Sequence, residues 1–172
     1  MQRLIIIRGN SASGKSTVAK ELRLRMGYKS MLIQQDIVRR EILRVQDLPG
    51  NPSIQLIYSL AMYGKSIGYD VVIEGILHAD KCSEMLKKLI NDFGGKSYIY
   101  YFDKPFEETL RRHNTKLREK NEYGEAEMRR WWREKDYLNL SDEKIIHATS
   151  SKEEIINTIF NNQAESKSAK LL

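Results

Sequence analysis

The chain contains very little cysteine and has no long apolar run. Cys82 is the single cysteine among 172 residues, so no disulfide can form within the chain, and a reducing compartment is expected. The apolar run nearest the N-terminus covers only residues 4–7, which is too short for a secretory signal or a membrane-spanning helix. We therefore expect a cytoplasmic protein without a membrane partner.

Internal repeats and a recognisable interdomain linker are also missing from the sequence. The length fits one domain, and the 41% of apolar residues is enough to form a sizeable core. The residues after 162 are mostly polar. We expect a single domain over residues 1–162 and a flexible tail over residues 163–172.

Negative charge is the scarcer sign. The chain carries 29 Lys and Arg against 23 Asp and Glu, a formal net charge of +6. This balance suits a protein that handles anions such as nucleotides, phosphorylated substrates or nucleic acid. A basic surface without such a partner is the alternative, and charge alone does not decide between the two.

Five short apolar runs without helical periodicity are typical of strands buried on both faces. They cover residues 3–8, 30–35, 70–75, 97–102 and 144–148. Helical patterns lie between them, over residues 15–26, after Asn51-Pro52, over 80–93, after Pro105, and after a capping box expected at Ser150 and Glu153. The alternation predicts an α/β fold with a mainly parallel sheet and helices on both faces.

Residues 113–130 differ in composition from the rest of the chain. Nine of these eighteen residues are Lys, Arg, Asp or Glu, and few are apolar. Such a segment cannot bury much surface. We expect either a solvated helical excursion or a mobile lid.

The stretch "GNSASGKST" at residues 9–17 follows the first strand and precedes a helix, and it matches G-x-x-x-x-G-K-[ST]. Its glycines let backbone N–H groups point at phosphate oxygens, and the helix adds its positive end. Lys15 would reach the β- and γ-phosphates, and the Ser16 hydroxyl would bind Mg²⁺. An ordinary glycine-rich turn is the alternative. The predicted contacts to a nucleoside triphosphate such as ATP are Gly9, Asn10, Ser11, Ala12, Ser13, Gly14, Lys15, Ser16 and Thr17.

Asp36 follows the second strand, at the edge of a parallel sheet where ligands bind. A carboxylate there could accept the proton of an attacking hydroxyl, which makes Asp36 a candidate general base. The alternative is a helix N-cap, and the two roles are compatible. Arg39 lies one helical turn further on and is a candidate for an anionic group of the substrate.

Glu74 ends the third run and has three candidate roles. It could hold Mg²⁺ through water, bind substrate hydroxyls, or cap a turn, and no spacing rule selects one of them. His78 lies four residues further on and could face the acceptor pocket, although a packed histidine is the commoner case.

Six cations lie in or beside the charged segment. They are Arg111, Arg112, Lys116, Arg118, Arg129 and Arg130. Two or three of them are expected to contact phosphate, because phosphoryl transfer spreads charge over the transferred oxygens. A solvated basic face is the alternative. Trp131 and Trp132 follow, and core packing is the favoured interpretation for both, although adjacent residues cannot share one helix face.

With these motifs placed, the chain resembles small P-loop kinases, the group that includes zeta-toxin kinases, chloramphenicol phosphotransferase and the kinase domain of polynucleotide kinase. The resemblance covers residues 3–160 and is carried by "GNSASGKST", "QQDIVRRE", "VVIEG" and "FDKPFEETLRRHNTK". It implies a P-loop NTPase fold of three α/β/α layers, with a five-stranded parallel sheet in the order 2-3-1-4-5 and a helical lid.

The resemblance also implies roles for individual residues. The general base falls on Asp36, the substrate-side arginine on Arg39, and a lid arginine on Arg112. A second lid arginine is common four residues later, where this chain has Lys116. That change loses bidentate phosphate binding and leaves Arg118 or Arg130 as substitutes. The loop after the last strand would pass the adenine, with Thr149 and Ser150 as candidates.

The favoured function is a Mg-ATP-dependent kinase that phosphorylates a hydroxyl of a small molecule. A kinase for nucleic-acid 5′-hydroxyls is favoured by the basic charge and by Asp36-x-x-Arg39, but the chain lacks a long basic stripe interleaved with aromatic residues. A third candidate is an ATP-hydrolysing switch in which Glu74 serves the metal. The motifs do not identify the acceptor, the choice between ATP and GTP, or the oligomeric state.

Overall fold

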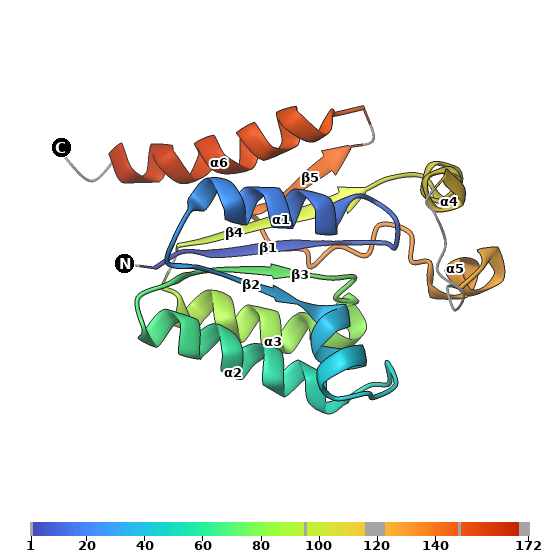
Figure 1. Ribbon diagram of the computed structural model, residues 1–172, viewed down its shortest axis with the longest axis horizontal. Helices are drawn as coiled ribbons and strands as arrows, with labels where there is room; N and C mark the ends of the chain where they lie inside the picture. Colours follow the sequence, from blue (N-terminus) through green and yellow to red (C-terminus); the bar gives the residue numbers. More distant parts are fainter. Residues whose placement is uncertain (1, 95, 116–122, 148, 169–172) are drawn as a thin grey trace.

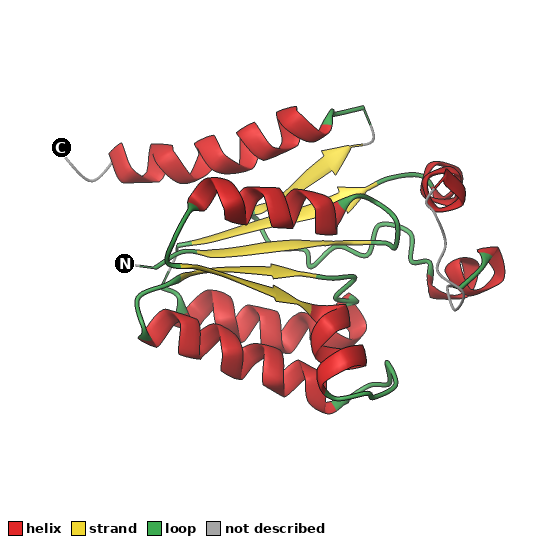
Figure 2. Ribbon diagram, in the orientation of Figure 1, coloured by secondary structure: helices red, strands yellow, loops and turns green. Residues whose placement is uncertain are grey.

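The computed structural model of the chain describes residues 2–94, 96–115, 123–147 and 149–168, with side chains described as far as residue 162. A parallel sheet lies between two layers of helices (Figure 2). The three-layer α/β/α arrangement expected from the sequence is confirmed.

Each of the five expected strands is present. They are β1 (Leu4–Gly9), β2 (Ser30–Gln34), β3 (Asp70–Glu74), β4 (Ser97–Asp103) and β5 (Glu143–His147). Their order in the sheet is β2-β3-β1-β4-β5, and every neighbouring pair is parallel. This is the predicted order, and it places β1 in the centre, where Leu4 is aligned with Val71 of β3 and Ser97 of β4.

The five expected helices begin close to their predicted positions, and two shorter helical segments occur besides them. They are α1 (Lys15–Met26), the π-helical turn η1 (Ile37–Ile42), α2 (Pro52–Ser66), α3 (Ala79–Asp92), α4 (Phe106–Thr115), α5 (Glu125–Trp131) and α6 (Lys152–Ser168). The expected cap of α2 is confirmed, because the Asn51 side chain accepts a hydrogen bond from the Ser53 amide. Within the described residues, no helix is long and apolar enough to cross a membrane.

The central strand explains how the two helical layers are held. Leu4 and Ile6 of β1 pack on the side of α2 and α3, whereas Ile5 and Ile7 pack on the side of α1 and α6. All four side chains have no exposed surface. A strand buried on both faces therefore requires the uninterrupted apolar run seen in the sequence. Figure 1 shows α1 and α6 above the sheet and α2 and α3 below it, while α4 and α5 lie beyond the carboxyl ends of the strands.

The expected cap of the C-terminal helix needs correction, while the flexibility of the tail stays a prediction. The capping box of α6 is formed by Ser151 and Glu154, one residue later than expected: the Ser151 amide donates to Glu154 Oε2, and the Glu154 amide donates to Ser151 Oγ. The same Ser-x-x-Glu spacing fits either serine of the Ser150-Ser151 pair, so the pattern alone does not fix the register. Helix α6 also continues to Ser168, so the start of the predicted flexible tail is helical.

The single cysteine lies on α3 and is buried in the core. Cys82 is 1% exposed, and burial raises the pKa of its thiol to about 12. The thiolate is the reactive form of cysteine, so this side chain is unreactive near neutral pH and serves in packing.

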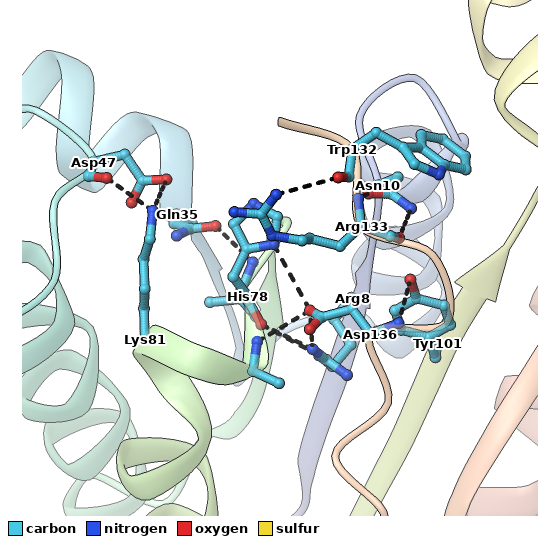
Figure 3. Close-up of polar contacts among 12 residues, drawn as sticks. Arg8, Asn10, Gln35, Asp47, His78, Lys81, Tyr101, Trp132, Arg133 and Asp136 are labelled. Carbon is cyan, nitrogen blue, oxygen red and sulfur yellow. Dashed lines mark hydrogen bonds and ion pairs between the residues drawn. The ribbon is translucent and has the colours of Figure 1, made fainter. Parts of the chain in front are cut away.

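A buried arginine lies at the end of β1, immediately before the glycine-rich loop. The Arg8 side chain has no exposed surface, and its guanidinium pairs with Asp136 at 2.9 Å and with Glu143 at 3.0 Å. It also donates to the Leu77 carbonyl and lies over the Tyr101 ring (Figure 3). One charge therefore joins the central strand to β4, to β5, to the start of α3 and to the segment after α5.

We predict that Glu143→Ala lowers the free energy of unfolding by about 3 kcal/mol, because removing one partner of a buried ion pair leaves charge poorly compensated. The substitution also removes the acceptor of the Leu138 amide. Urea denaturation measures the change. The control is Glu153→Ala, which removes an exposed partner of Arg25 and should cost less than about 1 kcal/mol. Equal losses in both variants would contradict the importance of the Arg8 pairs.

Candidate active site

Two glycines of the loop between β1 and α1 are required by its backbone. Gly9 has a φ of 135°, and a Cβ atom there would lie 2.7 Å from the Phe102 carbonyl oxygen. Gly14 has a φ of 98° and caps α1 in the left-handed region. Side chains rarely adopt such conformations. The two fixed glycines of the motif are therefore explained by close approach and by positive φ.

Lys15 begins α1 and folds back over the loop. Its side chain is buried, and its ammonium donates to the Asn10 carbonyl at 2.7 Å and to Ser13 Oγ at 3.3 Å. The positive charge therefore lies inside the curve of the loop and beside the N-terminus of α1, where an anion is favoured.

Ser16 and Glu74 are in direct contact. The Ser16 hydroxyl donates to Glu74 Oε1 at 3.0 Å, and Gln34 Nε2 donates to Glu74 Oε2 at 3.1 Å. Glu74 is 5% exposed at the end of β3. This places the carboxylate beside the predicted magnesium ligand, so of its three candidate roles the contact favours the metal. Its assignment to substrate binding stays a prediction.

Asp36 lies at the start of η1, and its side chain is 65% exposed. It makes no capping hydrogen bond to the described backbone of η1, so the geometry does not support the N-cap alternative. Instead, Asp36 Oδ1 accepts a bond from Arg39 Nη2 at 3.2 Å, and Arg39 also donates to the Val45 carbonyl. The arginine therefore holds a carboxylate that is open to solvent.

A cavity of about 510 Å³ opens beside η1, and we call it the η1 cavity. It brings together residues of the glycine-rich loop, η1, the start of α3 and the region of α5, among them Ser11, Asp36, Arg39, His78, Tyr123 and Arg130. His78 is 6% exposed, and its Nδ1 lies 3.7 Å from Asp136 (Figure 3). The structure therefore places Asp36, Arg39 and His78 around one cavity that also borders the glycine-rich loop, which we call the phosphate loop from here on.

Arg112 lies against the phosphate loop at Gly14. Its Nη1 is 3.5 Å from the position of a Cβ on Gly14, and its Nε donates to Glu108 at 2.6 Å. Together with Thr17, Lys104 and Ser150, it lines a cavity of about 130 Å³, which we call the α4 cavity. Thr149, the other candidate for the adenine contact, lines a different cavity with His147 and Trp132.

Lys104 is a site residue that the sequence analysis did not identify. It is 2% exposed in the wall of the α4 cavity. Burial lowers the pKa of its ammonium, and the positive charge of Arg112 lowers it further. A bound anion at this position would favour the charged form of Lys104.

The remaining cations of the charged segment have different surroundings. Lys116 and Arg118 lie outside the described residues. Arg130 borders the η1 cavity. Arg111 pairs with Glu108 and Arg129 with Glu125, in exposed pairs one helical turn apart. Arg111 and Arg129 therefore fit the solvated-face alternative.

The phosphate loop is hydrogen-bonded to both flanks of α5. The Asn10 side chain makes both bonds to Arg133: its Nδ2 donates to the Arg133 carbonyl at 2.7 Å, and its Oδ1 accepts from the Arg133 backbone amide at 3.0 Å (Figure 3). Ser11 Oγ shares a 2.6 Å hydrogen bond with the Tyr123 hydroxyl. Two consecutive loop residues thus hold the two ends of one helix of the expected lid. Tyr123 is the single Phe, Tyr or Trp in the charged segment of residues 113–130. An aromatic residue among charged ones was the one sequence feature that could have indicated a contact at this position.

Neither tryptophan is fully buried, in contrast to the core packing that the sequence favoured. Trp131 borders the η1 cavity and packs its ring edge against Tyr123, which in turn stacks on His113. Trp132 packs against Phe106 of α4. The pair therefore joins α5 to α4 and to the cavity wall.

The sequence matches no protein-family model and no curated protein. Solved structures share the fold. The APS kinase of Mycobacterium tuberculosis, solved with AMPPNP and APS, is 18% identical with a TM-score of 0.70, and the match covers 93% of this chain and 96% of that one.

Two further structures are similar to a comparable extent. A gluconokinase from Sinorhizobium meliloti 1021 is 16% identical with a TM-score of 0.66, covering 95% of this chain and 92% of that one. The tunicamycin resistance protein of Deinococcus radiodurans is 15% identical with a TM-score of 0.63, covering 94% and 95%. At these identities the likeness shows the fold, and the narrower resemblance to the zeta-toxin group stays a prediction.

We predict that Tyr123→Phe loosens α5, because it removes the hydrogen bond to Ser11 and keeps the ring contacts with His113 and Trp131. The lost bond should cost about 0.5–1.5 kcal/mol, which corresponds to a several-fold faster amide exchange in α5. Hydrogen exchange of residues 125–131 measures it. Tyr28→Phe on the exposed surface is the control. Unchanged exchange in Tyr123→Phe would show that the ring contacts alone hold the helix.

Proposed function

We propose that the protein is an ATP-dependent kinase that transfers the γ-phosphoryl group to a hydroxyl of a small-molecule acceptor. The observation that carries this proposal is the placement of Asp36 and of the phosphate loop around the η1 cavity. Ser11 of the loop and Asp36 border the same space. An acceptor in that cavity would lie next to the end of a triphosphate held by residues 9–17. The solved structures that share this fold include kinases, and by analogy they support the proposal.

The nucleotide side of the proposed site is formed by the loop, Lys15 and Arg112. Backbone N–H groups of residues 9–17 would hold the phosphates, with the Lys15 ammonium beside the β- and γ-phosphates. The α4 cavity would take the base side, and Ser150 lines it together with Ser13 and Gly14 of the loop. Arg112, over Gly14, would add positive charge to the triphosphate.

The residues also fit a magnesium ion. The Ser16 hydroxyl and the Glu74 carboxylate offer the oxygen ligands that Mg²⁺ prefers, and they touch each other. Across the described part of the chain, no three His, Cys, Asp or Glu side chains form a metal cluster, so phosphate oxygens and water would complete the coordination. When bound, Mg²⁺ supplies positive charge to the β- and γ-phosphate oxygens.

Asp36 would act as general base in the transfer. The acceptor oxygen forms a bond to the γ-phosphorus while its proton passes to the Asp36 carboxylate. The bond from the γ-phosphorus to the bridging oxygen breaks, and ADP leaves with that electron pair. Arg39 holds Asp36 at 3.2 Å and so positions the carboxylate toward the cavity.

An acceptor screen tests the proposal. ADP release is measured with Mg-ATP and a library of metabolites, antibiotics and 5′-hydroxyl oligonucleotides. A kinase of small molecules releases ADP slowly alone and quickly with one such acceptor. A rise with the oligonucleotides would support the nucleic-acid alternative. Turnover that no acceptor changes, and that a protein partner stimulates, would support the ATP-hydrolysing switch.

We predict that Lys15→Ala lowers acceptor-dependent ADP release by about 10²- to 10³-fold, because a preorganised charge on the phosphates is lost. Binding of a fluorescent ATP analogue should also weaken, while circular dichroism stays unchanged. The matched control is Lys87→Ala, an exposed lysine on α3. Wild-type turnover in Lys15→Ala would overturn the proposal.

Asp36→Asn should leave ATP affinity nearly unchanged and cut phosphoryl transfer by about 10²- to 10⁴-fold, because an amide cannot take the acceptor proton. Single-turnover transfer and equilibrium ATP binding separate the two effects. Asp142→Asn, at an exposed position before β5, controls for the lost charge. Turnover within a few-fold of wild type would contradict the role of Asp36 as general base and leave it only as the ion-pair partner of Arg39.

A further inference from the structure

The η1 cavity has more positive than negative charge, and its charges are not all paired. Three arginines and two aspartates line it. Arg39 pairs with Asp36 at 3.2 Å, and Asp47 pairs with Lys81 at 2.9 Å. The two carboxylates are therefore already neutralised by cations.

Two arginines remain. Arg40 and Arg130 line the cavity, and the structure records no ion pair of either one with a carboxylate among the described residues. Arg130 lies over the ring of Trp131, 6.0 Å from its centroid. An exposed arginine on a convex surface is commonly solvated. These two instead border one concave space, where low-dielectric walls focus the field of unpaired charges.

The two guanidinium groups come from separate parts of the fold. Asp36, Arg39 and Arg40 come from η1 and the residue before it, and all three line the cavity. Arg130 belongs to α5, whose flanks are bonded to the phosphate loop. Figure 1 shows the helical turn that follows β2 (light blue) and α5 (orange) as separate elements, both at the carboxyl end of the strands. Arg40 and Arg130 therefore reach the cavity from two elements, with the base Asp36 beside Arg40.

The rest of the lining suits a polar ligand with a flat portion. Leu48 and Ile76 are the apolar aliphatic side chains of the wall, and the rings of Tyr123 and Trp131 form another part of it. A volume of about 510 Å³ holds a metabolite of moderate size. Arg40 and Arg130 are exposed residues of this lining, and a neutral acceptor would give neither of them an anion to bind.

We propose that the acceptor is itself an anion: a small molecule that carries a phosphate, sulfate or carboxylate group in addition to the hydroxyl that is phosphorylated. Arg40 and Arg130 bind the oxyanion through charge-assisted hydrogen bonds, and the hydroxyl faces Asp36. This inference rests on the proposed kinase function and names the substrate class of the same site.

A binding experiment tests the anion site without catalysis. The protein is saturated with Mg²⁺ and AMPPNP, which occupies the phosphate loop, and inorganic sulfate is titrated against chloride at constant ionic strength. Calorimetry and the fluorescence change of Trp131 in the cavity wall report binding. The double variant Arg40→Gln/Arg130→Gln should weaken sulfate binding at least tenfold. The charge-matched control is Arg23→Gln/Lys87→Gln, at exposed positions on α1 and α3, and it should bind sulfate as the wild type does.

Equal sulfate affinity in wild type and Arg40→Gln/Arg130→Gln would overturn the inference. A second arm compares ADP release with phosphorylated, sulfated and carboxylated metabolites and with their neutral parents. Full activity of the double variant on a neutral acceptor would leave the kinase function standing and refute the anion site. Sulfate binding that depends on Arg40 and Arg130, with no acceptor accelerating ADP release, would uphold the anion site and refute the kinase function.

Discussion

The site depends on how one buried positive charge is neutralised. Arg8 ends the central strand, and its guanidinium has no exposed surface. An uncompensated charge in such a place is very unfavourable, so Asp136 and Glu143 have to lie against β1. Asp136 also accepts the Ala79 amide and lies beside His78. The pairing of Arg8 therefore fixes β5, the segment after α5 and the start of α3 around the end of β1, where the phosphate loop begins.

Around this anchor the site separates into two sides. On one side, Lys15 bonds to the loop and Ser16 bonds to Glu74, with Arg112 and Lys104 at the α4 cavity. Asp36 and Arg39 form another group on η1, across the cavity from α5. The π-helical turn belongs to this second side: the Leu43 amide bonds to the Val38 carbonyl five residues earlier. Such turns are frequent at functional sites, and this one presents charged side chains to a cavity.

The sequence was sufficient where local patterns carry the information. Apolar runs identified the five strands. The spacing of Gly9, Gly14, Lys15 and Ser16 identified the loop, because the local backbone conformation requires these residues. It was insufficient where partners are distant. Asn10 bonds to Arg133, which is 123 residues away, and Ser11 bonds to Tyr123. The contact of Glu74 with Gln34 also needed the fold, since only the pairing of β2 with β3 sets the two side by side. The α6 cap was missed because two neighbouring serines satisfy the same pattern.

The bonds of Asn10 and Ser11 to the flanks of α5 have a thermodynamic consequence. Ordering a helix costs conformational entropy for each residue that it fixes. In this protein that cost is met for α5 by hydrogen bonds and ring contacts within the chain. A ligand that binds beneath α5 then meets a preorganised wall, and its contacts contribute to affinity instead of offsetting the ordering of the helix. Because the tethers start from the phosphate loop itself, rigidity at the nucleotide end of the site extends directly to the far wall of the η1 cavity.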